Sequence, residues 1–206
     1  TRAIGNNIEK PESFILKKLI TTFKKGLIKR TQLKHYSNPR RGGIYAIDIN
    51  EGDELIQAKT IQENQDIILA TNKGKAIRFE EHQIKSTGRK TKGVTGIRMS
   101  FQNDYVVDML IIKREGQVFV VSEKGYGKRS ENTAYRCQKR GGKGAFTLKS
   151  TEKTGKLISI MEVVDEDDLM IITNKGTMIR QPIKTINIIG RNTQGVRLIK
   201  LKENAT

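Results

Sequence analysis

One pattern occurs four times in this 206-residue chain, and its spacing constrains the fold more than any other feature. Each copy is an apolar run, a Lys-Gly turn and a short stretch with a cation soon after the glycine: TTFKKGLIKRTQL (residues 21–33), LATNKGKAIRFEE (69–81), VVSEKGYGKRSEN (120–132) and IITNKGTMIRQPI (171–183). The turn glycines lie 48, 51 and 51 residues apart, at Gly26, Gly74, Gly125 and Gly176. A second set is spaced by 50, 51 and 51 residues, at Gly43, Gly93, Gly144 and Gly195. Two independent markers with one period predict about four copies of a unit of roughly 50 residues.

The second unit shows what one copy contains. DIILATN (66–72) and KAIRFE (75–80) flank Lys73-Gly74 as two strands flank a hairpin turn, where glycine supplies the positive φ. VTGIRM (94–99) and YVVDMLIIK (105–113) add two more strand-like runs, and the first unit follows the same order through GIYAIDINEGDELI (43–56). No window of about 12 residues shows the 3.6-residue period of a helix. The sequence therefore predicts an all-β, propeller-like ring of four-stranded blades, in which closure limits the exposed strand edges.

The repeat also predicts the domain boundaries. We expect blades over about 14–61, 62–112, 113–163 and 164–201, after the tail of a preceding blade at 1–9, because TRAIGNNI (1–8) is similar to GRNTQGVRLI (190–199). Elsewhere the second glycine precedes the next turn glycine by 31 or 32 residues, but Gly5 precedes Gly26 by only 21. Either this unit is shortened, or about ten residues are missing between Ile8 and Phe14; we predict the second.

Charge is the main compositional signal. Lys and Arg number 39 against 22 acidic residues, a net charge of +17, which opposes compaction by self-repulsion and indicates an anionic partner. Nucleic acid is favoured over an anionic membrane surface and over a role in solubility alone. No apolar run approaches the roughly 20 residues that span a bilayer, and no signal peptide is visible. The single Cys137 excludes an internal disulfide and fits a reducing compartment.

The cations cluster at two places in each unit. The strand cations follow the turn glycine: Lys29, Arg30, Arg78, Lys128, Arg129 and Arg180. The loop cations precede the second glycine: Arg40, Arg41, Arg89, Lys90, Lys92, Lys139, Arg140, Lys143 and Arg191. Equivalent positions of successive blades lie at equal radius, so both sets are predicted to form a curved basic belt that binds the phosphates of a bent polyanion. For most of the 39 cations taken singly a solvated surface charge is favoured, whereas for the loop cations as a set contact with phosphate is favoured.

Sites for chemistry are not apparent. CQKRGGKGAF (137–146) is neither a phosphate-binding P-loop nor a Rossmann fingerprint, and His35 and His82 lack metal-ligand spacing. The acidic run at 165–168 is either a solvated turn, which is favoured, or a site for a divalent cation. No nucleophile stands near a candidate base, so we predict a chain with no catalytic residue, metal or cofactor of its own.

The successive motifs KKGLIKRTQLKHYSNPRRGGIYAIDINEGDELI (24–56), TNKGKAIRF (71–79), GRKTKGVTGIRM (88–99), EKGYGKRSENTAYRCQKRGGKG (123–144), DEDDLMIITNKGTMIR (165–180) and GRNTQGVRLIKL (190–201) resemble the later blades of the C-terminal, DNA-wrapping domain in the A subunit of DNA gyrase, which is a bacterial type IIA topoisomerase. The resemblance implies a β-pinwheel with duplex DNA wrapped around its outer rim, so that the holoenzyme introduces negative supercoils with ATP. It also implies a heterotetramer of the A and B subunits of gyrase, ATP and Mg²⁺ on other domains, a monomeric isolated domain, a catalytic tyrosine outside this chain, and a place in the bacterial cytoplasm beside the nucleoid.

The hallmark of that family, the gyrase A box, reads Q-R-R-G-G-K/R-G. The matching loop here consists of Gln138, Lys139, Arg140, Gly141, Gly142, Lys143 and Gly144, with Lys139 in place of an arginine. The family's box belongs to the first of typically six blades, whereas this copy lies in the third of four units. We therefore expect a related loop of a later blade, with the true box upstream of Thr1. Gln138 and the cations of this loop join the predicted DNA contacts.

Two alternatives stay open at this stage. One is the C-terminal domain in the A subunit of topoisomerase IV, which shares the blades, although the length of the match in the last two units favours gyrase. The other is a propeller that docks a protein partner and uses its basic rim only for solubility.

Overall fold

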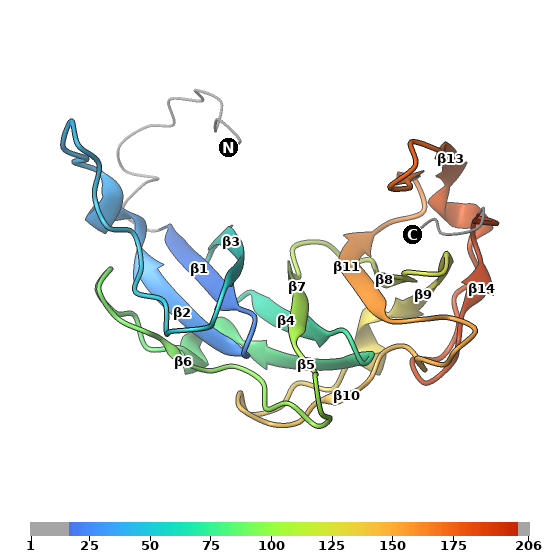
Figure 1. Cartoon of the computed structure of the whole chain (residues 1–206), viewed down its shortest axis with the longest axis horizontal. Coiled ribbons are helices and arrows are strands. Elements are labelled where there is room, and N and C mark those ends of the chain that lie inside the picture. The colour runs from blue at the N-terminus through green and yellow to red at the C-terminus, as the bar shows by residue number, and fades with distance from the viewer. Residues whose placement is uncertain (1–16, 202–206) are drawn as a thin grey trace.

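The computed structural model describes residues 17–201, which form short strands joined by turns (Figure 1). Fourteen strands lie in this part of the chain: β1 (Lys18–Phe23), β2 (Leu27–Gln32), β3 (Leu55–Ile61), β4 (Asp66–Thr71), β5 (Lys75–Glu80), β6 (Val94–Thr95), β7 (Val106–Ile111), β8 (Gln117–Ser122), β9 (Tyr126–Glu131), β10 (Ala145–Phe146), β11 (Leu157–Val163), β12 (Asp168–Ile172), β13 (Met178–Pro182) and β14 (Val196–Arg197). One 3-10 turn follows each hairpin: η1 (Leu33–Tyr36), η2 (Glu81–Gln83), η3 (Asn132–Ala134) and η4 (Ile183–Thr185). Within residues 17–201 no helix has the length and apolar character to cross a bilayer. The predicted tail at 1–9 and the suspected junction between Ile8 and Phe14 lie outside the described residues.

The strands of residues 17–201 form four antiparallel sheets, and three of these sheets borrow a strand from the next unit. The four sheets of residues 17–201 have the orders β3-β1-β2-β6, β10-β5-β4-β7, β11-β8-β9-β14 and β12-β13. The borrowed strands β6, β10 and β14, which we call donated strands, pair with β2, β5 and β9 of the preceding unit. The all-β, four-stranded blade is therefore confirmed for three sheets, but a blade is not one contiguous stretch of sequence.

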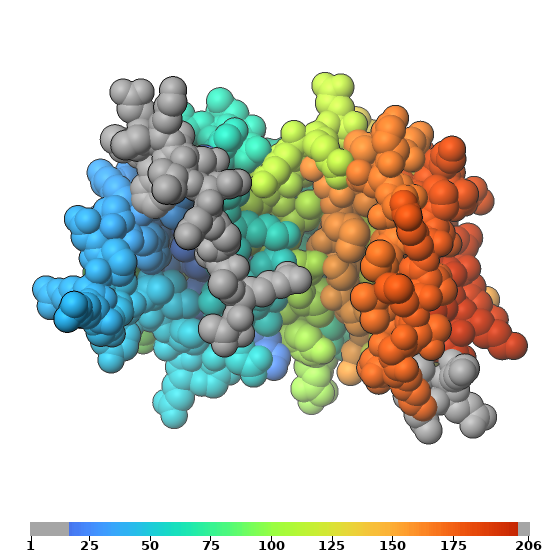
Figure 2. All heavy atoms as spheres, turned by 90° about the horizontal axis from the view of Figure 1, so that it is seen from above, coloured from blue at the N-terminus to red at the C-terminus, as the bar shows by residue number. Residues whose placement is uncertain are grey.

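The sheets follow one another along an open arc. Figure 1 shows β3, β7 and β11 on the concave side and the donated strands β6, β10 and β14 on the convex side. Figure 2 shows the same succession from above, running from blue to red along the long axis. The predicted closed ring is not seen in residues 17–201, whose sheets occupy an arc.

Small apolar clusters between neighbouring sheets hold the arc together. In β4, Ile67 and Leu69 pack towards the first sheet, whereas the alternate residues Ile68 and Ala70 pack towards the third. Successive side chains of a strand point to opposite faces, so an uninterrupted apolar strand such as β4 is explained by a neighbour on each side. A third cluster joins Phe119 of β8 to Leu169 of β12 and the η4 region.

Close packing against the donated strand explains why two glycines keep one period. A Cβ on Gly74 (φ +78°) would lie 2.1 Å from the carbonyl oxygen of Leu148, just after β10. A Cβ on Gly144 (φ +64°), just before β10, would lie 2.4 Å from the carbonyl oxygen of Ala76 in β5. The turn glycine of one unit and the second glycine of the next therefore sit on the two sides of a single joint, which fixes their separation.

The first loop and the last hairpin lack such a joint. Residues 43–50 form no strand, contrary to the order expected from GIYAIDIN, and Tyr45 is 79% exposed. A donated strand needs a preceding hairpin, and none lies beside these residues in the described part of the chain. At the other end, β12 and β13 form a two-stranded sheet, with Ile172 and Met178 exposed.

Candidate nucleic-acid interface

Three of the strand cations are arginines that lock one blade to the next. Arg30, Arg78 and Arg129 occupy equivalent places in β2, β5 and β9. Each donates to a backbone carbonyl in or beside the next 3-10 turn: Arg30 to Glu81 at 3.3 Å, Arg78 to Asn132 at 2.9 Å, and Arg129 to Ile186 at 2.7 Å. Each also pairs with a carboxylate, that of Glu81, Asp66 and Asp165 respectively. The charge of these blade-locking arginines is thus largely used inside the protein.

Two lysines of the same set are buried under the following loop. The Lys29 ammonium donates to the carbonyl of Arg89, and the Lys128 ammonium donates to the carbonyls of Gly190 and Arg191 and to Thr193 Oγ1. Both side chains are fully buried. Burial, together with the nearby Arg191 charge, lowers the pKa of Lys128 to about 8, and burial likewise lowers the pKa of Lys29. Neither ammonium is exposed to meet a phosphate in this conformation.

Arg180 is the exception among the strand cations. Its side chain is 71% exposed, and among residues 17–201 its guanidinium pairs only with Asp168 of the neighbouring strand, with Nε 3.0 Å from Oδ2. By sequence it is equivalent to Arg30, Arg78 and Arg129, but no following 3-10 turn lies against it in the described residues.

The loop cations lie on the convex edge, and three arginines among them join consecutive loops. Arg89, Arg140 and Arg191 each donate a bond to the carbonyl of an equivalent residue one unit earlier: Tyr45 at 2.6 Å, Thr95 at 2.9 Å and Phe146 at 3.1 Å. We call them the rim arginines. Thr95 and Phe146 belong to donated strands, so these bonds hold neighbouring loops side by side along the outer edge.

The other loop cations are free of side-chain partners in the described part of the chain. They are exposed and form no side-chain hydrogen bond or ion pair with any residue of 17–201: Arg40, Arg41, Lys90, Lys92, Lys139 and Lys143. The structure therefore separates the predicted DNA contacts into buried joints and an exposed series on successive loops.

The box-like loop, residues 138–144, is held flat against the second blade. The backbone N–H of Gln138 donates to the Arg78 carbonyl, and the backbone N–H of Gly141 donates to the Gly96 carbonyl at 2.6 Å. The Arg140 amide donates to Gln83 Oε1 at 2.9 Å. The glycines of this loop thus allow it to pack closely against the second blade. The backbone N–H of Gly141 is hydrogen-bonded within the protein and is not available to a phosphate. Lys139 and Lys143 are the exposed cations of this loop.

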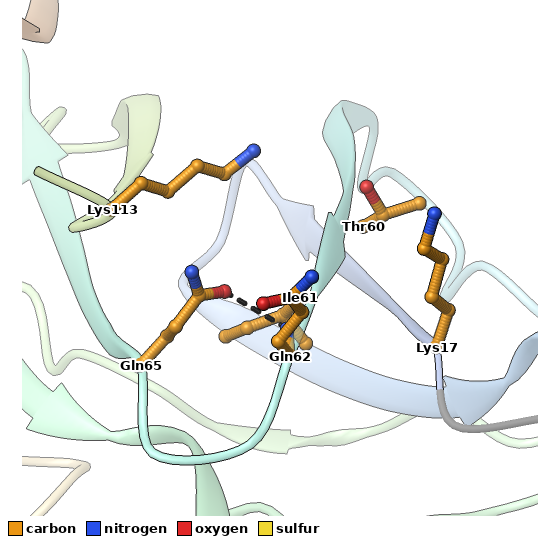
Figure 3. Close-up of a pocket in the computed structure, with 6 residues that line it drawn as sticks. All are labelled: Lys17, Thr60, Ile61, Gln62, Gln65 and Lys113. Carbon is orange, nitrogen blue, oxygen red and sulfur yellow. Dashed lines mark hydrogen bonds between the residues drawn. The ribbon is translucent and has the colours of Figure 1, made fainter. Parts of the chain in front are cut away.

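A hollow of about 330 Å³ between the ends of β3 and β7 is lined by Lys17, Thr60, Ile61, Gln62, Gln65 and Lys113 (Figure 3). The dashed line in that view marks the hydrogen bond that the backbone N–H of Gln62 donates to Gln65 Oε1, at 2.9 Å. This lining offers neither a nucleophilic thiol nor a carboxylate that could act as a base.

The acidic run and the single cysteine have other surroundings. Three of the carboxylates pair with arginines: Asp165 with Arg129, Asp167 with Arg114, and Asp168 with Arg180. No cluster of three or more His, Cys, Asp or Glu able to hold a metal occurs among residues 17–201. Burial and the carboxylates of Asp66 and Glu80 raise the pKa of the Cys137 thiol, which disfavours a reactive thiolate.

One group of cations was missed by the sequence reasoning. Lys124, Lys153, Arg197 and Lys200 surround a hollow of about 340 Å³ beside Tyr126. Arg197 and Tyr126 lie 71 positions apart, so their contact exists only because β14 is donated to the preceding blade. No local spacing in the sequence signals this group.

The comparisons with known proteins agree on one family. The family model described as "DNA gyrase C-terminal domain, beta-propeller" matches residues 24–62, 65–113, 116–163 and 167–206. The DNA gyrase A subunit of Deinococcus deserti is 40% identical over 184 residues, covering 87% of this chain and 23% of that protein. The DNA gyrase A subunit of Helicobacter pylori is 44% identical over 179 residues, covering 85% of this chain and 22% of that protein. The chain thus spans less than a quarter of the length of these relatives.

Solved structures match the whole arc. A structure titled "Structure of DNA gyrase A C-terminal domain" superposes with a TM-score of 0.84 at 25% identity, covering 93% of this chain and 64% of that one. The C-terminal domain of DNA topoisomerase IV superposes with a TM-score of 0.83 at 21% identity, covering 90% of this chain and 58% of that one. The second likeness shows a shared fold.

Proposed function

This chain belongs to the DNA gyrase C-terminal domain family, and from that premise we propose that it binds duplex DNA along its convex edge and bends the duplex there. One observation carries the proposal. Exposed cations with no side-chain partner among residues 17–201 recur on consecutive loops of that edge, and the rim arginines hold these loops side by side. The cations are Arg40 and Arg41, Lys90 and Lys92, and Lys139 and Lys143.

Phosphate neutralisation is the physical basis of such binding. Each Lys or Arg that meets a phosphate releases condensed counterions, which favours binding without reading sequence. Bending a duplex of about 20–30 bp costs several kcal/mol, so contacts must recur along the curve to offset it. A repeated loop on the outside of an arc supplies contacts at regular intervals along the bent duplex.

The family supports a place for this function in a larger enzyme. We propose that the chain is a non-catalytic part of the A subunit of a gyrase, which assembles with the B subunit into a heterotetramer in the bacterial cytoplasm. In that enzyme ATP and Mg²⁺ would act on other domains, and DNA wrapped on this edge would allow negative supercoils to be introduced. The isolated chain is expected to be monomeric.

The two alternatives fit the observations less well. The relatives above that are at least 40% identical are named as A subunits of DNA gyrase, whereas the likeness to topoisomerase IV is one of fold at 21% identity. A protein-docking propeller would not need a series of unpaired cations on successive loops.

Salt and DNA length test the proposal. Binding of duplexes of about 20 and about 150 bp is measured by fluorescence anisotropy between about 50 and 200 mM salt. If all six free loop cations contact phosphates, the logarithm of the binding constant should fall with the logarithm of the salt concentration at a slope of about −5 on the longer duplex. The shorter duplex should show a less negative slope, because it reaches fewer loops. An affinity that is independent of salt and of length would contradict the proposal and favour a protein partner.

A further inference from the structure

A cation-lined hollow lies where the third hairpin meets its donated strand. Its lining is Lys124, Tyr126, Lys153, Arg197, Ile199, Lys200 and Leu201, and its volume is about 340 Å³. The residues come from three segments: the β8–β9 turn with the first residue of β9, the loop after β10, and β14 with the residues that follow it. Figure 1 shows β14 on the outer side of the arc, so this hollow belongs to the convex half of the third blade.

Within residues 17–201 the four cations have no acidic partners. Lys124, Lys153, Arg197 and Lys200 are all exposed, and none of them forms an ion pair with a carboxylate in the described part of the chain. The Lys124 ammonium donates to the carbonyl of Glu152, and the Lys153 ammonium lies 5.5 Å from the centre of the Tyr126 ring. Like charges so placed repel one another, and a bound anion would relieve that repulsion.

Arg197 is held in a fixed orientation. Its Nε and Nη2 lie 3.2 and 2.8 Å from Tyr126 Oη, and its guanidinium carbon lies 5.4 Å from the ring centre. Tyr126 is only 6% exposed, so it is a rigid support. An arginine has five N–H donors, and this contact leaves Nη1 and one N–H of Nη2 available. A guanidinium fixed in this way is suited to bind a phosphate through two N–H groups.

The other sheets do not repeat this arrangement. Tyr126 pairs with Arg197 across the strands, whereas the equivalent pairs are Lys75 with Phe146 and Leu27 with Thr95. In the second sheet, the Lys75 ammonium lies 5.1 Å from the ring centre of Phe146 and 5.6 Å from that of Phe101. Two rings flank that cation, and the first sheet has no cation at this pair. The cluster is therefore a local feature of the third blade and distinct from the repeated loop cations.

We propose that the hollow beside Tyr126 binds one phosphate of the DNA backbone and fixes the position of the duplex on the third blade. This assignment rests on the proposed function and adds to it a specific phosphate seat. Lys124, Lys153 and Lys200 supply charge around the phosphate, and Arg197 supplies the directed N–H groups.

The test compares a variant that lacks two exposed charges of the hollow with a control variant that lacks two exposed charges elsewhere on the surface. The double variant Lys153→Gln, Lys200→Gln is set against the matched control Lys34→Gln, Lys184→Gln, which changes exposed lysines on η1 and beside β13 on η4. For a duplex of about 150 bp, one lost phosphate contact lowers the magnitude of the salt slope by about 0.9 and weakens binding roughly eightfold near 0.1 M salt. The control should keep the wild-type slope. Equal losses in the two variants, or no loss in either, would overturn the proposal.

A second measurement does not depend on DNA. Inorganic pyrophosphate is titrated into the whole chain while the Arg197 Nε–H resonance is followed by NMR. The proposal predicts a saturable shift that is lost in the Lys153→Gln, Lys200→Gln variant and kept in the control. A shift without any effect of the variant on DNA binding would overturn the DNA assignment and indicate a site for free phosphate.

The two proposals fail in different ways. A wild-type chain that binds pyrophosphate but no DNA would contradict the proposed function, and with it the DNA assignment of the seat. A wild-type chain that binds DNA with the expected salt slope, but shows no pyrophosphate shift and no change in the variant, would overturn the seat alone.

Discussion

Two sets of cations repeat with the same period in this chain, yet their surroundings are opposite. Lys128 and Arg129 in β9 are at most 4% exposed and bind carbonyls and a carboxylate of the next blade. Lys139 and Lys143, one loop further along, are exposed and unpaired within the described residues. The first pair joins blades, and the second is open to a polyanion.

The comparison shows that a repeated charge need not be a surface charge. A strand inside the arc is covered on both faces by its neighbours, so a cation there must find acceptors within the protein. A loop on the convex edge has no next layer, so its lysines stay solvated. The net charge of +17 therefore includes buried strand cations that are bonded within the protein and do not face DNA.

The largest expected effect is on DNA affinity. Replacing Lys90, Lys92, Lys139 and Lys143 together by Gln removes up to four phosphate contacts, which lowers the magnitude of the salt slope by about 3.6 and weakens binding roughly a thousandfold or more near 0.1 M salt. Because all four side chains are exposed, the midpoint of urea unfolding should move little. Anisotropy titrations and urea melts on the same preparations check both parts. Unchanged DNA affinity would remove these loops from the interface.

The next effect is on stability. Arg129→Ala breaks a partly buried ion pair and the bond to the Ile186 carbonyl, and we expect a loss of about 3 kcal/mol in the free energy of unfolding. Arg180→Ala, at the equivalent position of the last unit, removes an exposed pair and should cost less than about 1 kcal/mol. Urea unfolding measures both. Equal losses would show that burial between blades does not distinguish these arginines.

A smaller effect should appear as pH rises. The pKa of Lys128 is lowered to about 8 in the folded chain from an ordinary value of 10.5, so between these values the unfolded chain binds more protons. Folding stability should therefore increase with pH in this window, by about 2 kcal/mol between about pH 7.5 and pH 10.

The control for this effect is Lys128→Met, which lacks the titrating group. Other lysines titrate in both proteins, so the quantity of interest is the difference in unfolding free energy between wild type and variant, measured at each pH. A difference that stays constant with pH would contradict the lowered pKa of Lys128.

The sequence was sufficient for the repeat and its two glycine markers. Gly74 and Gly144 keep their spacing because each is pressed against the partner strand of one joint, and such steric requirements leave a readable period. The β hairpins at Lys73-Gly74 and Lys124-Gly125 were likewise predictable from turn chemistry.

The sequence was not sufficient for the partners across blades. A period cannot tell whether VTG at 94–96 pairs with its own unit or with β2 of the preceding one, because both choices keep the spacing. For the same reason the burial of Lys29 and Lys128, the bonds of the rim arginines and the cluster around Tyr126 were not foreseen. Each depends on residues at least 44 positions away.

The linking number of closed circular DNA tests the central claim most directly. Nicked circles are sealed by ligase with the wild-type chain, with the Lys90, Lys92, Lys139, Lys143→Gln variant, or without protein, and the topoisomers are then separated. If the convex edge bends DNA in one sense, the wild-type chain shifts the distribution in one direction in proportion to the protein bound, and the variant leaves it at the protein-free position. A wild-type distribution centred at the protein-free position under conditions where DNA is bound would contradict the claim that DNA curves around this edge.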